Sequence, residues 1–516
     1  MSTDDPTGAP GRIRYRFPPL ERRGVIAGWR AGQIGSVAAG LVVAVLAVRS
    51  RPSLAGVLVA ISVVGAAVAL AFWPVAGRTG EQWLPVVVRW AWTGATGRRF
   101  QSDPGPGRGI RLATDDEDDH DGGGRLRAAA DRSGTVSPSV FDGLRLIQPD
   151  DGTADGDGMG VVVDDRARTV TAVLSVRGHS FALLGPGEQD ARVAAWARVL
   201  ASLAREGSAV HRLQWVESCL PDDGRAVRSF AEHHGTLDPL APAARSYRAL
   251  LDESAPVTRR HRVLVAVTVH RSRAGRAVRG AGGGMAGAVA VLAREVAAVR
   301  RALSGVDLGV DGALSRNGLA GVLAEEFRSA PDARGTTAGT TPPPVGTSPW
   351  PMGLQTRWDA VRTDGAWHAV YWISEWPRID VHPDFLGPLF FAPLRRTLSM
   401  VMEPVDPVRA ARQVAQARTA GIADGELRRR NGFLTSARHT RERESVDDRD
   451  VELADGHAQF RFSGYVGVTA DTEAELTAAC AELEQAAGHS RIEVRRLFGQ
   501  QDGALLCVLP LGRGLS

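Results

Sequence analysis

Two apolar runs near the start of the chain determine its architecture: QIGSVAAGLVVAVLAV, from Gln33 to Val48, and LAGVLVAISVVGAAVALAFWPV, from Leu54 to Val75. Neither run contains a charged side chain, and each approaches the ~20 residues with which a helix crosses a bilayer. We therefore predict a transmembrane two-helix hairpin over residues 33–77, in which the backbone satisfies its own hydrogen bonds. A hairpin buried in a soluble core is the alternative, and the lack of a polar face disfavours it.

Arginines flank the hairpin and predict its orientation. The N-terminal segment 1–32 carries six arginines and residues 78–99 carry four, whereas the loop 49–53 carries two. Cytoplasmic flanks of membrane helices hold an excess of basic residues. We therefore expect a multi-pass protein of the cell (inner) membrane with both termini in the cytoplasm.

Composition excludes several classes of chemistry. All 62 basic residues among the 516 are Arg, so the chain has no lysine amine for Schiff-base catalysis or for a P-loop. Cys219, Cys480 and Cys507 lie far apart without CxxC spacing, which predicts neither a disulfide framework nor a zinc site. A net charge of +4 does not by itself indicate a nucleic-acid partner.

Residues 78–136 are predicted to form a juxtamembrane helix followed by an acidic flexible tether. Trp83, Trp90 and Trp92 suit a helix at the level of the lipid headgroups, and packing of these rings against the soluble region is an equal alternative. The run DDEDDHD at 115–121 is too polar to become ordered by apolar burial, and it lacks the ligand spacing of a calcium loop.

The remaining chain is predicted to be soluble and cytoplasmic. Residues 137–330 and 352–516 each alternate strand patterns with helical patterns, and a Pro/Gly/Thr-rich linker at 331–351 separates them. The expected fold class is α/β (α+β), with two domains built from repeated strand–helix–strand units. We expect mixed sheets of ferredoxin-like or related layout.

Local signals place several elements within these domains. β-Branched residues at 159–163 and 169–176 flank the turn DDRAR and predict a β-hairpin. Thr472 and Glu475 form a T-x-x-E capping box at the start of a helix. The apolar run at 504–509 predicts a strand near the end of the chain.

A long Arg-rich segment at 408–443 has a helical pattern. It predicts either one long helix or a broken pair of helices. Gly421, Gly425 and Gly432 are the candidate breaks, because glycine weakens a helix interior.

No catalytic, cofactor-binding or metal site is predicted. Gly282, Gly284 and Gly287 fit the pattern G-x-G-x-x-G, with Asp307 about twenty residues further on. A loop of about a dozen residues precedes them, whereas a dinucleotide-binding fold turns directly from strand into helix. The sequence GHS at 178–180 begins a nucleophile elbow but lacks its second glycine.

Two groups of residues are candidates for partner contacts. The first is a set of loop arginines that could contact phosphate, acidic lipid or an acidic protein, with simple solvation as the alternative. These are Arg271, Arg273, Arg276 and Arg279. The second is Trp372 and Trp376, expected to cluster with Tyr371 along one strand and its end. A core or domain-interface role comes first for these rings and a protein-binding surface second.

The sequence at 16–48, RFPPLERRGVIAGWRAGQIGSVAAGLVVAVLAV, resembles the start of PrgI-type proteins, in which a short basic segment precedes a two-helix hairpin. Together with RIEVRRLFGQQDGALLCVLPLG at 491–512, it resembles a family of actinobacterial integral-membrane proteins of conjugative or type IV secretion-like clusters. In that family a PrgI-like hairpin precedes a region similar to the N-terminal domain of the VirB-type secretion ATPase.

The resemblance implies a non-enzymatic inner-membrane scaffold with no catalytic residues and no cofactor. Its expected partners are the lipid bilayer, a separate secretion ATPase and other membrane components of a multi-subunit apparatus. The EccE component of type VII secretion is similar in coarse architecture and is the alternative. A DNA-handling adaptor that uses Arg271, Arg276 and Arg428–Arg430, or an enzyme that binds nucleotide at Gly284, would belong to another class.

Overall fold

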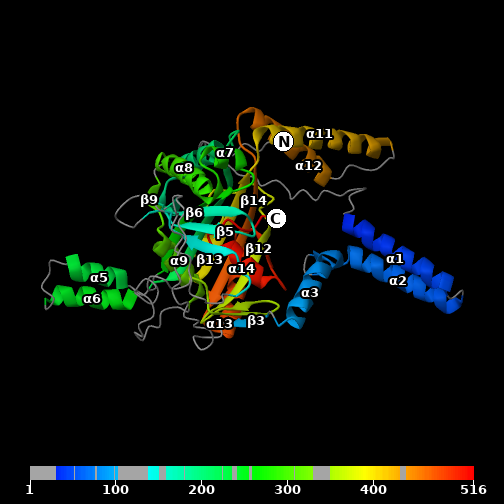
Figure 1. Cartoon of the computed structure of the whole chain (residues 1–516), viewed down its shortest axis with the longest axis horizontal. Coiled ribbons are helices and arrows are strands. Elements are labelled where there is room, and N and C mark those ends of the chain that lie inside the picture. The colour runs from blue at the N-terminus through cyan, green and yellow to red at the C-terminus, as the bar shows by residue number, and fades with distance from the viewer. Residues whose placement is uncertain are drawn as a thin grey trace, which may run out of the picture.

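The computed structural model describes residues 31–50, 53–75, 78–97, 99–102, 138–149, 158–178, 181–222, 225–234, 241–254, 259–306, 308–328, 349–430 and 437–515 (Figure 1). The N-terminal segment as far as Arg30, the acidic run at 115–121 and most of the linker 331–351 lie outside the described residues. The described chain consists of a membrane-type hairpin, a connecting helix and a sheet-based body from which two further helical hairpins project.

The two apolar runs form helices α1, Ala31–Ser50, and α2, Leu54–Phe72, which pack side by side. Each helix is long and apolar enough to cross a membrane. Their side chains are largely exposed, Leu58 by 57% and Ile61 by 64%, so the alternative of a hairpin buried in a soluble core does not hold. The helices approach closely at Gly40, where an added Cβ would lie 2.4 Å from the Cβ of Ala67.

The predicted end of the second membrane helix at Val75 is wrong, because α2 ends at Phe72. Pro74 has no backbone N–H, and its ring disfavours helical geometry in the residue before it. Three short elements then lead towards the body: β1 at Pro74–Val75, β2 at Arg78–Thr79 and α3 at Gly80–Ala95. The two strands pair with each other and turn the chain from α2 into α3.

Strands β3 to β15 of the described chain form one sheet. They are β3 Phe100–Ser102, β4 Leu144–Ile147, β5 Val161–Asp164, β6 Thr169–Arg177, β7 Val210–Pro221, β8 Arg259–His270, β9 Gly309–Ala313, β10 Gly353–Thr356, β11 Val361–Arg362, β12 Trp367–Glu375, β13 Arg396–Pro404, β14 Phe460–Ala470 and β15 Glu493–Arg496. Every pairing between these strands is antiparallel, so the expectation of mixed sheets is wrong.

On each side of the central pair β7–β13, the strands follow the same order relative to their positions along the chain. One side continues through β8, β6, β5 and β4, and the other through β14, β12, β11 and β10; β9 pairs with β6, and β15 with β12. We call β4–β9 with their helices the first half, and β10–β15 with theirs the second half. The predicted regions 137–330 and 352–516 therefore share one sheet, joined by seven residue pairs from Arg396↔Cys219 to Met402↔Leu213.

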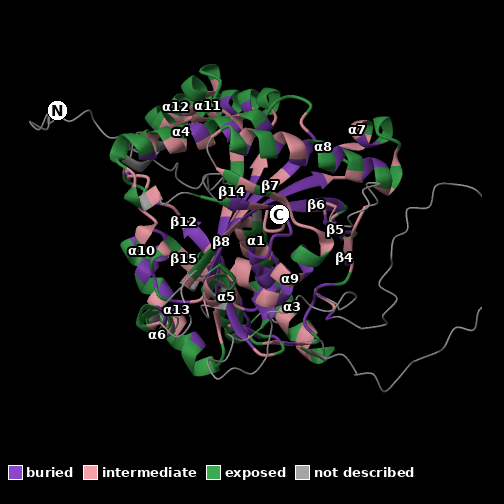
Figure 2. Ribbon diagram, turned by 90° about the vertical axis from the view of Figure 1, so that its left-hand side faces the viewer, coloured by how far each residue is buried: buried purple, intermediate pink, exposed green. Residues whose placement is uncertain are grey.

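Helices cover both faces of this sheet. They are α4 Pro186–Leu203, α7 Gly275–Gly280, α8 Gly284–Ser304, α9 Arg316–Phe327, α10 Gly387–Phe390, α13 Glu473–His489 and α14 Gln501–Val508, with a short 3-10 turn at Phe181–Leu183. Trp215 of β7 contacts the apolar core under α4 and α8 and also the core under α10 and α13, so both cores lie on one face. Val216 belongs to the core of the opposite face, under α9 and α14. Figure 2 shows the buried strands enclosed by helices with exposed outer residues.

Two helical hairpins are inserted at equivalent places in the two halves. The first, between β7 and β8, consists of α5 at Arg225–His234 and α6 at Pro242–Ser254. The second, between β13 and β14, consists of α11 at Pro407–Arg430 and α12 at Ala437–Ala454. Because β7 and β13 are antiparallel, the hairpins project from opposite ends of the central strands (Figure 1).

The Arg-rich segment at 408–443 is therefore a pair of helices, one of the two predicted forms. Gly421 and Gly425 do not break α11. They lie beside the side chain of Arg443 from α12, and Cβ atoms added at these glycines would make ordinary van der Waals contact with it, at about 4.0 Å and 3.4 Å. Gly432 lies outside the described residues.

Other local predictions have mixed outcomes. The hairpin around DDRAR is confirmed as β5 and β6, and the Thr472–Glu475 capping box is confirmed at the start of α13. The predicted strand at 504–509 is wrong, because these residues belong to helix α14. Gln501 fixes this helix on the sheet face, since its Oε1 accepts a hydrogen bond of 2.8 Å from the backbone N–H of Val370 in β12.

The segment 509–515, which follows α14, crosses from the second half to the first. The fully buried side chain of Gln214 in β7 donates to the carbonyl of Leu509 over 2.9 Å and accepts from the N–H of Gly512 over 2.7 Å. Arg513 then donates to the buried carboxylate of Asp164 in β5 over 2.7 Å. The end of the described chain thus helps to hold the halves together.

Candidate interaction surfaces

Helix α3 connects the membrane-type hairpin to the second half of the body. The rings of Trp83 and Trp90 lie 5.8 Å and 5.1 Å from the ring of Trp358, between centroids. Val86 is buried in the same contact. Gly499 has a left-handed φ of 68°, and an added Cβ there would lie 2.7 Å from Trp358 and 2.9 Å from Val86. Only a glycine at this position allows α3 to pack so closely.

The opposite face of α3 is apolar and exposed. Leu84, Val87, Val88 and Trp92 recur at helical spacing, and all four are exposed. The two interpretations of the tryptophans therefore apply to different residues: Trp83 and Trp90 pack on the body, and Trp92 faces outward. The sequence signal that separates them is the 3.6-residue period, which places positions 83, 86 and 90 on one face.

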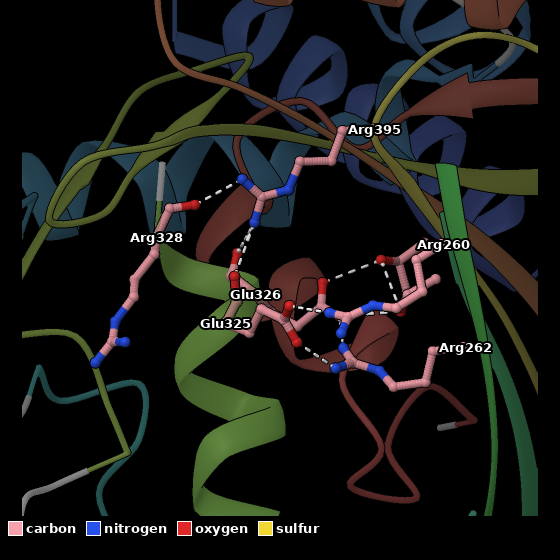
Figure 3. A network of polar contacts seen from close by, with 8 residues as sticks. Arg260, Arg262, Glu325, Glu326, Arg328 and Arg395 are labelled. Carbon is pink, nitrogen blue, oxygen red and sulfur yellow. Dashed lines mark hydrogen bonds and ion pairs between the residues drawn. The ribbon is translucent and has the colours of Figure 1, made fainter. Parts of the chain in front are cut away.

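A network of charged side chains, which range from buried (Glu326) to exposed (Arg260), lies where α9 meets strands β8 and β13 (Figure 3). Arg262 of β8 pairs with both Glu325 and Glu326 at the end of α9, and Arg260 also pairs with Glu325. Arg395, next to β13, donates to the backbone carbonyls of Glu325 and Arg328 over 2.8 Å and 2.6 Å. The arginines of this network are therefore held by protein partners, and the network links the halves.

A second buried ion pair lies across the central strand pair. Arg396 of β13 is completely buried and pairs with Glu217 of β7. Its other guanidinium nitrogens donate to the carbonyls of Leu389 and Phe390 over 2.8 Å and 2.6 Å. His261 Nδ1 lies 2.7 Å from the other carboxylate oxygen of Glu217. Sequence reasoning missed both networks, because each joins residues that are distant in the chain.

A third polar cluster surrounds Glu403 at the start of the α11–α12 hairpin. Arg273 donates to the Glu403 carboxylate over 2.8 Å, and Arg212 lies 3.6 Å from it. Burial lowers the pKa of the neighbouring His211 to about 4, and the positive charge of Arg212 adds to this effect. Burial alone would raise the pKa of Glu403, but the hydrogen bond from Arg273 and the nearby positive charges lower it.

The four predicted interaction arginines do not form one surface. Arg271 pairs with Asp165 at 3.1 Å, and Arg273 pairs with Glu403, so both are held in the body. Arg276 and Arg279 lie on helix α7, are exposed, and have no ion pair among the described residues. The structure therefore reduces this candidate surface to two residues.

The predicted tryptophan cluster is divided between the two faces of the sheet. Trp372 packs against the core of α9 and α14, and its Nε1 donates to Ser463 over 3.0 Å. Tyr371 belongs to the core on the opposite face, and Trp376 lies beyond the end of β12 against Phe462 at 5.6 Å. The core interpretation of Trp372 and Trp376 fits better than a protein-binding surface, because both rings are half-buried.

The glycine run has a structural role between α7 and α8. Gly282, Gly283 and Gly284 have φ values of 100°, 72° and 60°, which bring the chain from one helix into the next. An added Cβ at Gly287 would lie 2.4 Å from the carbonyl oxygen of Val278 in α7. Asp307 and the residues His179 and Ser180 lie outside the described part of the chain.

Among the described residues, no group of three His, Cys, Asp or Glu side chains is arranged to hold a metal ion. The comparisons with known proteins add no assignment: no protein-family model matches the sequence, and no curated protein matches it. The features available for a functional inference are therefore the hairpin, its junction with the body and the exposed charges.

Proposed function

We propose that this protein is a non-enzymatic scaffold of the cell membrane that holds a cytoplasmic platform against the bilayer in a type IV secretion-like or conjugative apparatus. The platform would dock a separate secretion ATPase. The proposal includes a multi-pass topology with both termini in the cytoplasm, which the arginines flanking the hairpin favour.

The junction between α3 and the second half is the observation that carries this proposal. Trp83 and Trp90 pack on Trp358, and Arg89 donates to Asp502 over 3.1 Å on the same side of α3. A flexible anchor would need none of these contacts. A packed junction fixes the position of the body relative to the hairpin, and a docking platform requires such a fixed position.

The outward face of α3 supports the membrane side of the proposal. A stripe of exposed apolar residues next to a membrane-type hairpin suits the boundary between headgroups and hydrocarbon. Trp92, the exposed ring of this stripe, belongs to the residue type that is enriched at that boundary.

We further infer that the two halves are repeats of one strand–helix–strand unit. The identical strand order and the equivalent insertion points of the two hairpins support this inference. A repeated unit gives the platform two equivalent insertion points for a helical hairpin. The hairpins α5–α6 and α11–α12 occupy these points with different sequences, so each can contact a different partner.

Arg276 and Arg279 are the docking residues that we assign to the ATPase contact, because they are exposed and have no acidic partner among the described residues. The test is co-expression of the full-length chain with a secretion ATPase of the type IV or the type VII class, followed by affinity purification from solubilised membranes. We expect the ATPase to co-purify, and the double charge reversal Arg276→Glu/Arg279→Glu to reduce its yield at least tenfold, as measured against the parent chain.

The matched control is Arg300→Glu/Arg301→Glu at the other end of α8, where two exposed arginines are reversed without an expected effect. Purification of the chain without any ATPase would contradict the proposal. The type of ATPase recovered separates a type IV-like apparatus from the alternative, an EccE-like role in type VII secretion.

A further inference from the structure

The α11–α12 hairpin carries a concentrated positive charge at its far end. From Arg428 to Arg443 the sequence contains six arginines and a single acidic residue, Glu442, which gives a net charge of +5 over 16 residues. Helix α11 ends at Arg430 and α12 begins at Ala437, so the fold brings both parts of this basic segment to the end furthest from the sheet.

The described side chains at this end are exposed and incompletely neutralised. The side chains of Arg429 and Arg430 are 78% and 74% exposed, and both pair with the same carboxylate, Glu426. Arg441 and Arg443 of α12 are also exposed. One carboxylate shared by two guanidinium groups leaves excess positive charge, which is available to an anionic surface.

The other end of the hairpin has a different charge. Near the sheet, α12 carries Asp447, Asp448, Asp450 and Glu452. Arg418 of α11 pairs with two of these acids, at 3.6 Å and 3.0 Å. The hairpin is therefore polarised along its length, with its acidic part against the body and its basic part away from it.

The basic end and the membrane-type hairpin lie on the same side of the body. In Figure 1 both α1–α2 and α11–α12 project towards the right, whereas α5–α6 projects from the left. If α1–α2 enters the bilayer as the proposed function requires, the far end of α11–α12 approaches the cytoplasmic surface of that bilayer. No other described hairpin of the body has this position.

We propose that the far end of α11–α12 binds the anionic phospholipid headgroups of the membrane that α1–α2 enters, through Arg429, Arg430, Arg441 and Arg443. Each Arg close to an anionic lipid surface strengthens binding by about fivefold. The contact acts over about one Debye length, roughly 8 Å at physiological salt, so it orients the platform only when the hairpin tip is at the surface. Together with α3 it gives the body two separate points of attachment.

Energy transfer from the hairpin to labelled lipid headgroups tests this contact in the full-length chain, reconstituted into vesicles. The donor dye is placed at Ile422→Cys on α11, and the control dye at Leu250→Cys on α6; both native side chains are 59% exposed. The native cysteines are buried or half-buried, and labelling of the parent chain measures their background.

We expect energy transfer from position 422 to rise when phosphatidylglycerol is added to phosphatidylcholine vesicles. It should fall again when salt is raised from about 0.1 M to about 1 M, because the Debye length shortens from ~10 to ~3 Å. Transfer from position 250 should not respond to lipid charge. The variant Arg429→Glu/Arg430→Glu should weaken the contact on the order of 25-fold or more. Reversal of two exposed arginines near the body, Arg409→Glu/Arg412→Glu, should leave it in place.

Transfer from position 422 that does not depend on lipid charge would overturn the proposal. A second result would also overturn it: the chain in neutral vesicles binds a short DNA duplex, the Arg429→Glu/Arg430→Glu variant does not, and lipid charge has no effect on the transfer. The basic end would then bind nucleic acid and not lipid. Retention of the chain in vesicles after an alkaline wash tests the hairpin anchor separately, so failure of the proposed membrane anchor and failure of this contact are distinguishable.

Discussion

The two halves of the sheet have the same strand order but carry different attachments. The first half has the hairpin α5–α6, which exposes apolar side chains such as Phe230 and Leu250 and projects away from α1–α2. The second half receives α3 on Trp358 and carries the arginine-rich hairpin α11–α12. The same arrangement of strands thus has one half joined to the membrane-type hairpin through α3 and one half whose inserted hairpin points away from it. The difference lies in the inserted and preceding helices.

The largest expected effect tests whether the halves depend on each other. Arg396→Met leaves Glu217 buried without its guanidinium partner at the central strand pair. We expect a loss of about 3–5 kcal/mol in the free energy of unfolding, measured by urea denaturation of the detergent-solubilised chain with tryptophan fluorescence. Arg378→Met, at an exposed ion pair, is the control. A loss below about 1 kcal/mol would mean that the halves are stable independently.

The next effect concerns the second half, on which α3 packs. Trp358→Ala removes the ring on which Trp83 and Trp90 pack, and we expect a loss of about 3 kcal/mol. Hydrogen exchange should rise in α3 and in the neighbouring second half, while the strands of the first half keep their protection. Trp92→Ala, on the exposed face of the same helix, should change neither quantity. Equal loss of protection in both halves would remove the distinction between them.

Each half contains a buried histidine that makes stability depend on pH. Burial lowers the pKa of His211 to about 4 and that of His368 to about 3; the latter lies between the hydroxyls of Thr363 and Thr469, 2.8 Å and 3.0 Å away. Below the usual pKa of about 6.5 the unfolded state binds more protons than the folded one, so stability falls as pH decreases towards 4. We expect about 2 kcal/mol from each histidine.

Urea denaturation between pH 7 and pH 4.5 measures this dependence. The variants His211→Gln and His368→Gln should each remove about half of it. If one variant removes all of it, the two halves differ in their response to acid, and only one of them would open under acidic conditions.

The smallest effect is expected on the surface of α11–α12. Arg418→Gln breaks exposed ion pairs with Asp447 and Asp450, and such pairs contribute less than about 1 kcal/mol. We expect a change within about 0.5 kcal/mol in the free energy of unfolding, and no change in the response of the hairpin tip to lipid charge. A larger destabilisation would show that the acidic end of the hairpin is needed to hold its two helices together.

Signals within a few residues predicted local structure well. The charge-free runs at 33–48 and 54–75 located α1 and α2 to within three residues, and the DDRAR turn located β5 and β6. The error at Val75 had a local cause too, the proline at 74. The run at 504–509 is apolar throughout, and an apolar run of this length fits a strand or a buried helix equally.

The arrangement of the whole sheet could not be predicted in the same way. Pairing of β7 with β13 joins residues that are distant in the chain, and no periodicity encodes a partner. The candidate surfaces depend on it: Arg271 and Arg273 find Asp165 and Glu403 only when the sheet is assembled. The exposed arginines of the short helix α7 have no such partner among the described residues, and Arg429 and Arg430 at the end of α11 share a single one on their own helix, Glu426.

The segment 509–515 has a consequence for the order of synthesis. The carboxylate of Asp164 is buried in the first half, and its partner Arg513 follows it by 349 residues. At ~5–20 residues per second, a ribosome makes Arg513 about 20–70 s after Asp164. By then α1 and α2 have long since emerged from the ribosome. The carboxylate of Asp164 therefore lacks its partner, and the first half stays accessible to chaperones, until the segment 509–515 has been made.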